Sequence, residues 1–322
     1  MRFEKIRPTL VVSLLGILFA FASAAAIAQQ QPQGKEASEW KAVEGAMNRS
    51  GEAQPDGAFK FSMPRKDLKV TVAGTQVKAG LALGSWAAFK KMGNQAMLMG
   101  DLVLTEQEVE PVMKKLQEGG VEITALHNHL LGETPRVMYM HIGGMGDPVK
   151  LAQTIRAALD LTKTPPADSA SPAAAQEKLD IDTARIEQIL GHKGKIKGGI
   201  LQFSIPRATP SKLEIKGTDS LGLGAPDIPN SMGVAQALNF EPTGNGKAAI
   251  TGDFVLIAKE VNPVMRALRD NGIEVTALHS HMIEEQPRLF FMHFWANNDA
   301  VKLAQGLRAA LDKTDSKKAE VK

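Results

Sequence analysis

The chain has 322 residues, of which 43% are hydrophobic and 23% are charged, and it contains no cysteine. The absence of cysteine excludes disulfide frameworks, thiolate metal sites, a cysteine nucleophile and a lipidated cysteine. Lysine and arginine total 38 against 35 acidic residues, and residues 1–28 hold three of the basic residues and one of the acidic residues. The nearly neutral remainder argues against a nucleic-acid partner.

The first 28 residues predict a signal peptide. Three basic residues precede an uncharged apolar run over residues 10–22, and an A-x-A sequence follows and ends at Ala28. This order is typical of a cleaved secretory signal, and the run is shorter than the roughly 20 residues that span a bilayer. We therefore expect a periplasmic or secreted protein with no stable membrane insertion after signal cleavage.

A tandem repeat organises the rest of the chain. Residues 121–141 align without gaps with residues 273–293, and 11 of the 21 positions are identical. Between the two copies, residues 162–178 are rich in proline, alanine and serine, which is typical of a linker. We predict a first α+β repeat over residues 35–161 and a second over residues 179–313.

The apolar pattern predicts the same elements in both repeats. In the first repeat we expect a helix near residues 39–48, strands at 58–63, 69–72 and 96–104, a helix at 105–118, strands at 121–130 and 136–142, and a helix at 149–161. Thr105 and Glu108 form a capping box at the start of the second helix, and Asp147 with Pro148 begins the third.

This element order predicts an α+β fold of two tandem repeats. Each repeat would be an antiparallel sheet with helices on one face, of the ferredoxin-like split β-α-β type. Such a sheet leaves its other face open to solvent. Packing the open faces of the two copies together would cover both.

Six of the seven histidines form two matched trios. The first trio is His127, His129 and His141, and the second trio is His279, His281 and His293. If the hairpin turn of the first repeat centres on Thr134, His127 lies opposite His141, on the face that it shares with His129. A shift of two residues keeps that face, whereas a shift of one separates the trio. The seventh histidine, His192, is assigned no role.

Three imidazoles on one face suit a transition metal ion, with zinc or copper as the first candidates. Three protein ligands leave an open coordination position, as in catalytic zinc sites. Glu133 and Glu285 each follow the second histidine of a trio by four residues, and could act as a ligand or as a catalytic base. A polar ligand pocket and structurally satisfied histidines are the competing interpretations.

Other repeated residues have several possible roles. Arg136 and Arg288 could hold an anionic substrate, but pairing with the turn glutamates is favoured. Asp101 and Asp253 could be bulge residues, edge residues or hydrogen-bond acceptors for a histidine ring. Met140 lies one position from His141, so we expect its side chain to point away from the histidines into the core.

The repeated segment T-A-L-H-x-H, then P-R and M-H, followed by V-K-L-A-Q, resembles the LppY/LpqO family of exported bacterial proteins. The resemblance covers both copies and nearly all of the mature chain. It implies export and a domain of unknown function, with no activity to carry over. Lipoprotein members of that family carry a lipidated cysteine, which this chain lacks.

Three functional hypotheses follow, and the sequence leaves enzymatic activity undecided. The preferred one is a periplasmic protein that binds a transition metal through the trio of each repeat. The second is a metal-dependent hydrolase in which Glu133 or Glu285 activates water. The third is a module that binds a small organic ligand between facing sheets.

Overall fold

The computed structural model describes residues 33–166, 178–213 and 226–318. The predicted signal peptide, and all but the ends of the predicted linker, lie outside these ranges. From Trp40 onward the described residues form one compact unit, which contains nearly all of both predicted repeats. None of the described helices has the length and apolar character of a membrane span.

The first repeat alternates strands and helices. Its elements are α1 (Gln33–Met47), β1 (Glu52–Ala53), β2 (Ala58–Pro64), β3 (Val70–Val72), β4 (Thr75–Val77), α2 (Ala79–Ala82), β5 (Gly84–Met92), β6 (Gln95–Thr105), α3 (Glu106–Glu118), β7 (Glu122–His127), β8 (Glu133–Thr134), β9 (Val137–Gly146) and α4 (Pro148–Leu159).

The second repeat follows a closely similar order. Its elements are α5 (Thr183–Leu190), β10 (Lys195–Lys197), β11 (Ile200–Pro206), β12 (Lys212–Leu213), the 3-10 helix η2 (Asn230–Met232), β13 (Ala235–Gly244), β14 (Lys247–Leu256), α6 (Ala258–Asp270), β15 (Glu274–His279), β16 (Glu285–Gln286), β17 (Phe290–Asp299) and α7 (Ala300–Leu311).

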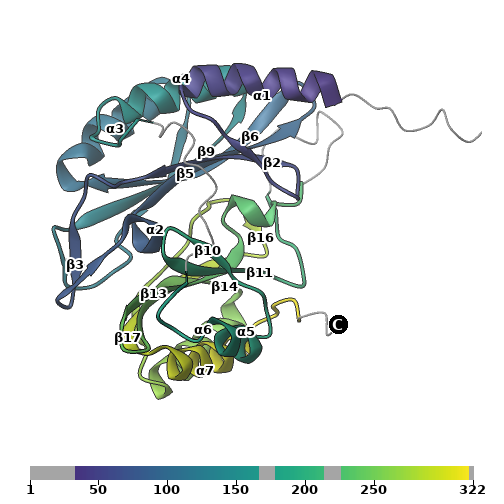
Figure 1. The fold of residues 1–322 in the computed structure, drawn as a ribbon. Coiled ribbons are helices and arrows are strands. Elements are labelled where there is room, and N and C mark those ends of the chain that lie inside the picture. The colour runs from purple at the N-terminus through teal and green to yellow at the C-terminus, as the bar shows by residue number, and fades with distance from the viewer. Residues whose placement is uncertain (1–32, 167–177, 214–225, 319–322) are drawn as a thin grey trace, which may run out of the picture. The chain divides into compact units, whose positions relative to one another are not determined.

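Each repeat is built on one six-stranded antiparallel sheet (Figure 1). The strand order is β1-β2-β5-β6-β9-β7 in the first repeat and β10-β11-β13-β14-β17-β15 in the second. The two orders correspond strand by strand, which confirms the predicted duplication and the mixed helix and antiparallel-sheet architecture.

The prediction missed β5 and β13, which lie inside these sheets. Ala87, Ala88 and Phe89 of β5 are all buried, because helices cover one face of the sheet and the other repeat covers the opposite face. A strand buried on both faces lacks the alternation by which strands are recognised. The predicted strand at residues 69–72 exists as β3, but it belongs to a separate small sheet with β4 and β8.

The predicted starts of α3 and α4 agree with the structure, whereas α1 begins at Gln33, before the predicted start at residue 39. Glu108 accepts a hydrogen bond from the backbone N–H of Thr105 at 2.8 Å, as the predicted capping box requires. Asp147 accepts from Lys150 N at 2.9 Å, and Pro148 is the first residue of α4. These short-range polar patterns were sufficient to locate both helix starts.

A buried arginine connects each sheet to one helix, α3 in the first repeat and α6 in the second. Arg65 Nη1 lies 2.7 Å from both Val103 O and Glu108 Oε2. In the second repeat, Arg207 Nη1 lies 2.8 Å from Val255 O and 2.7 Å from Glu260 Oε2. In both copies the arginine therefore joins the end of one strand, the next strand but one in the sheet, and a helix.

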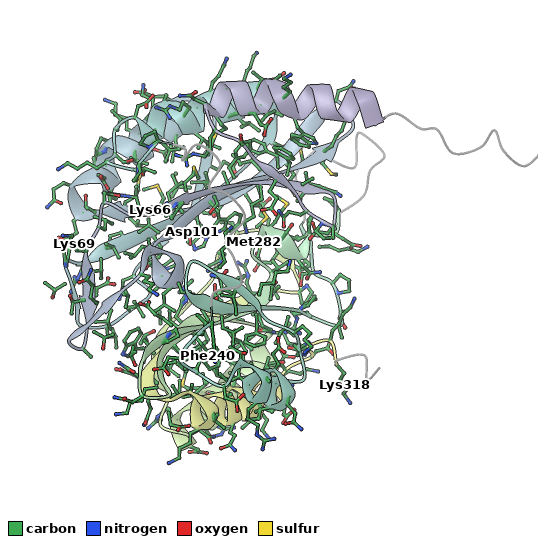
Figure 2. The ribbon with its side chains drawn as sticks, in the orientation of Figure 1. Lys66, Lys69, Asp101, Phe240, Met282 and Lys318 are labelled. Atoms are coloured by element: carbon green, nitrogen blue, oxygen red, sulfur yellow. The ribbon has the colours of Figure 1, made fainter. Side chains whose placement is uncertain are left out.

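Helices cover one face of each sheet, and the other faces of the two sheets pack against each other (Figure 1). Two hydrophobic clusters contain residues of both repeats: Val103 and Tyr139 pack with Trp295, and Met99 packs with Phe291. In Figure 2, Asp101 and Met282 lie between the two sheets. The predicted pairing of open faces is confirmed.

Candidate metal centre

Strand pairing places the histidines of each trio on one face. His127 lies opposite Tyr139, and Ala125 lies opposite His141. In the second repeat, His279 pairs with Phe291 and Ala277 pairs with the third histidine of its trio. This register differs by two residues from a hairpin centred on Thr134, so His127 and His141 are diagonal neighbours rather than direct partners. The shift is even, and the predicted shared face is confirmed.

His129 lies beyond the end of its strand. The strand predicted over residues 121–130 ends early, at His127. The backbone carbonyl of His129 accepts a 2.6 Å hydrogen bond from Thr276 Oγ1 of the second repeat. One repeat therefore helps to position a histidine of the other, a contact for which the sequence carried no signal.

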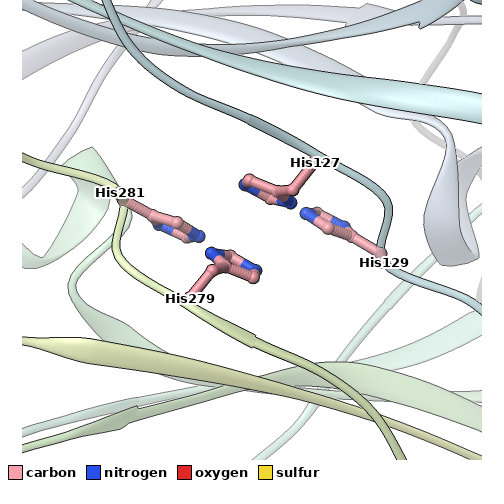
Figure 3. Close-up of side chains that lie close together, drawn as sticks. All are labelled: His127, His129, His279 and His281. Atoms are coloured by element: carbon pink, nitrogen blue, oxygen red, sulfur yellow. The ribbon is translucent and has the colours of Figure 1, made fainter.

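The two trios face each other across the sheet interface and form a single cluster of six rings. Three pairs of rings stack between repeats. Their centroids are 3.5 Å apart for His127 and His279, 3.6 Å for His129 and His293, and 3.6 Å for His141 and His281. Figure 3 shows four of the rings approaching from two opposite segments. Tyr139 and Phe291 stack on the outer faces of His129 and His281, both at 3.4 Å.

All six histidines have a buried Nε2 atom without a hydrogen-bond partner. Oδ1 of Asp101 and Oδ1 of Asp253 are buried and unpartnered in the same way. Buried polar atoms in native proteins are nearly always satisfied by protein, water or an ion. A cluster of eight such atoms at one place has the chemistry of a site for an ion or another polar ligand.

The potential ligand atoms fall into three groups in which all members lie within 4.8 Å of one another. One group combines both repeats: His127, His129, His279 and His281. The other two each belong to one repeat: Asp101, His129 and His141, and Asp253, His281 and His293. The structure thus brings all six predicted histidines together. The potential metal-binding groups do not coincide with the two predicted trios, and two of the groups each include an aspartate.

Asp101 and Asp253 lie on central strands and face the third histidine of each trio. Asp253 Oδ1 is 3.2 Å from His293 Nε2, and Asp101 Oδ1 is 3.9 Å from His141 Nε2. Both aspartates continue a regular strand register, so the bulge and edge interpretations are wrong. The preceding glycines allow close packing of the sheet: a Cβ on Gly252 would lie 1.8 Å from a backbone oxygen of β13.

One ring orientation is fixed by the backbone. His293 Nδ1 lies 2.9 Å from the carbonyl oxygen of Gly252. A carbonyl accepts only from a protonated nitrogen, so Nδ1 carries the proton and Nε2 of the neutral ring keeps its lone pair. That lone pair faces Asp253 and is available to a metal.

Burial sets the charge of the centre. It lowers the pKa of all six imidazoles, to about 4 for His127 and about 3 for His279, and the neighbouring rings contribute further lowering for most of them. Burial also raises the pKa of Asp253 to about 8, and raises that of Asp101 well above its ordinary value, with repulsion from Asp253 adding to it. At pH 7 the rings are neutral, which is the form that binds metals.

Glu133 and Glu285 stand apart from these groups. Each carboxylate accepts a hydrogen bond from the backbone N–H four residues later, at 3.2 Å from Val137 and 2.9 Å from Leu289. Burial raises the pKa of Glu133 to about 7. Neither glutamate belongs to a potential metal-binding group of the described residues, so their visible role is to hold the hairpin.

The remaining sequence predictions have mixed outcomes. Arg288 Nε lies 3.6 Å from Glu285 Oε1, and Arg288 also donates to the carbonyls of Met282 and Ile283. Met140 is fully buried in the helix-side core of its repeat, which confirms that it points away from the histidines. His192 lies outside the three potential metal-binding groups of the described residues.

Comparisons with known proteins identify a family but no activity. The profile of the family described as Domain of Unknown Function (DUF1259) matches residues 41–161 and 184–313. No curated protein matches the chain.

Two microcompartment shell proteins are among the solved structures with some similarity to this chain. Trimeric bacterial microcompartment shell protein PduB is 16% identical, with 81% of this chain and 88% of that chain covered and a TM-score of 0.19. EtuB from Clostridium kluyveri is 9% identical, with the same coverage and a TM-score of 0.19. Similarities this weak carry no argument about fold or function.

Proposed function

The chain belongs to the family described as Domain of Unknown Function (DUF1259), and from the geometry of its site we propose that it is a transition-metal-binding protein. One observation carries the proposal: six imidazole Nε2 atoms and two carboxylate oxygens are buried together without hydrogen-bond partners. A zinc or copper ion accepts both kinds of ligand, and neutral imidazole is the form that this site maintains.

We propose that each repeat holds one ion through an aspartate and two histidines. The two groups share no residue, so both could be filled at once. The 3.2 Å between Asp253 Oδ1 and His293 Nε2 is close to the roughly 3.3 Å that separates two ligands of one tetrahedral ion. Each carboxylate would also offset part of the charge of a buried dication, which the four-histidine group cannot do.

Elemental mass spectrometry on the untagged, folded protein tests this proposal. After saturation with zinc and gel filtration, we expect about two ions per chain. The double variant Asp101→Asn/Asp253→Asn should lose both ions, because amides are poorer ligands for zinc than carboxylates. His192→Ala is the matched control, since it removes a histidine outside the cluster, and it should retain both.

The same measurement can refute the proposal or revise it. A folded wild-type chain that retains neither zinc nor copper would overturn it and leave a packed cluster of neutral histidines. One ion per chain, kept in the aspartate variant and lost in His127→Ala/His279→Ala, would instead place the ion in the four-histidine group.

Three finer proposals rest on the sequence patterns. We propose that the protein is exported to the periplasm or secreted, which the signal-like residues 1–28 support. We propose kinship with the LppY/LpqO proteins, supported by the repeated histidine segment. We also keep the ferredoxin-like split β-α-β description of each repeat as a proposal, supported by the order of its helices and antiparallel strands.

A further inference from the structure

A cavity of about 990 Å³ extends from the metal centre between the two sheets. Strands β2, β5 and β6 of the first repeat and β11, β13 and β14 of the second contribute to its walls, together with α2. This volume is at the upper end of the range typical of small-molecule sites. The cavity therefore offers space for a ligand beside the centre.

Members of both aspartate–histidine groups line the cavity. Asp101 and His129 come from the first repeat, and Asp253 and His293 come from the second. Each of these four residues has a buried side-chain atom without a partner. A molecule in the cavity can thus reach the open coordination positions of ions held there.

The remaining charged residues that line the cavity are all cationic. They are Arg49, Lys60, Lys66, Lys78 and Lys197. The acidic residues in the lining are Asp101 and Asp253, whose charge the proposed ions would neutralise. A partly enclosed cavity that is lined by charges of one sign raises the local concentration of ligands with the opposite charge.

Lys60 is the cation best placed to select such a ligand. Its ammonium group lies 4.1 Å from the centroid of the Trp86 ring and donates to Ser231 O at 2.8 Å, contacts that hold it at the cavity wall. The equivalent position in the second repeat, also the third residue of its strand, is Gln202. The basic lining of the cavity therefore comes mainly from the first repeat, with Lys197 as the contribution of the second, whereas the centre draws equally on both.

We propose that this cavity binds a small molecule that carries carboxylate or phosphate groups, with one oxyanion beside Lys60 and another directed at the metal centre. The contact with the metal centre rests on the proposed metal binding. The selectivity for anions rests on the cationic residues that line the cavity. The inference adds a class of small-molecule ligand to the proposed metal-binding function.

Titration calorimetry on the zinc-loaded full chain, with citrate and with inorganic phosphate as probes, tests the inference. Lys60→Gln, which introduces the residue of the second repeat, should weaken binding about tenfold or more through loss of one charge-assisted hydrogen bond. Lys60→Arg should retain binding, and Lys302→Gln, at the exposed start of α7, should leave it unchanged. Zinc content is measured on every sample.

The outcomes separate the two proposals. Binding of either probe that depends on Lys60 supports the inference, and a preference for citrate or phosphate identifies the group that is recognised. Zinc-loaded protein that binds neither probe at millimolar concentration, or binds equally in Lys60→Gln, overturns it while metal binding stands. If no zinc is retained, metal binding fails. Lys60-dependent binding to the metal-free chain would then still support an anion site.

Discussion

The two repeats are alike at the centre and differ beside it. Asp101, His129 and His141 have identical counterparts in the second repeat, as does the arginine that ties sheet to helix. Around them, Lys60 corresponds to Gln202, and Tyr139 corresponds to a phenylalanine. The comparison indicates that both repeats contribute the same residues to the centre. They contribute different residues to the lining of the neighbouring cavity.

The largest expected effect concerns the buried arginine of each repeat. Arg65→Met and Arg207→Met should each destabilise the protein by about 3–5 kcal/mol, because each leaves a buried glutamate without its charge partner. Arg65 also forms two hydrogen bonds with Asp67, at 3.0 and 2.9 Å, so its replacement should cost more. Urea unfolding followed by circular dichroism measures both free energies.

An exposed arginine provides the control for that comparison. Arg156 pairs with Asp160 on the surface of α4, and Arg156→Met should change the free energy of unfolding by less than about 1 kcal/mol. Equal, small effects at Arg65, Arg207 and Arg156 would show that the duplicated arginines contribute little to holding the sheets and helices together.

The pH dependence of metal affinity distinguishes the aspartate groups from the four-histidine group. Burial raises the pKa of Asp253 to about 8, so below pH 8 a metal must displace the proton of that carboxyl. Affinity should then fall about tenfold per pH unit from pH 8 to pH 6. The histidines do not compete in this window, because their lowered pKa values keep the rings neutral. Chelator competition at several pH values measures the slope.

Two results would argue against ions bound by the aspartates. One is an affinity that stays constant from pH 8 to pH 6, as expected for four neutral imidazoles alone. The other is an unchanged slope in Asp101→Asn/Asp253→Asn, because an amide has no proton to lose in this range.

The sequence predicted what is local and repeated. The starts of α3 and α4, the shared face of each trio and the direction of Met140 into the core follow from periodicity and capping, which act within a few residues. Packing of the two open faces was predicted, but the meeting of the two trios was not, because periodicity within one repeat does not fix how the two sheets are aligned on each other. The cavity was missed for the same reason: Lys60 and Asp253 are distant in sequence, and only the sheet interface brings them together.

The smallest expected effect concerns the aromatic rings that flank the cluster. Tyr139 Oη donates to Ala82 O at 2.8 Å, whereas its counterpart Phe291 has no hydroxyl. Tyr139→Phe makes the first repeat resemble the second and should cost about 1 kcal/mol of unfolding free energy, the net value of one hydrogen bond. Metal content should not change, since the ring that stacks on His129 is retained. Thermal unfolding and elemental analysis measure the two effects, and a loss of metal in this variant would mean that the hydroxyl helps to shape the centre.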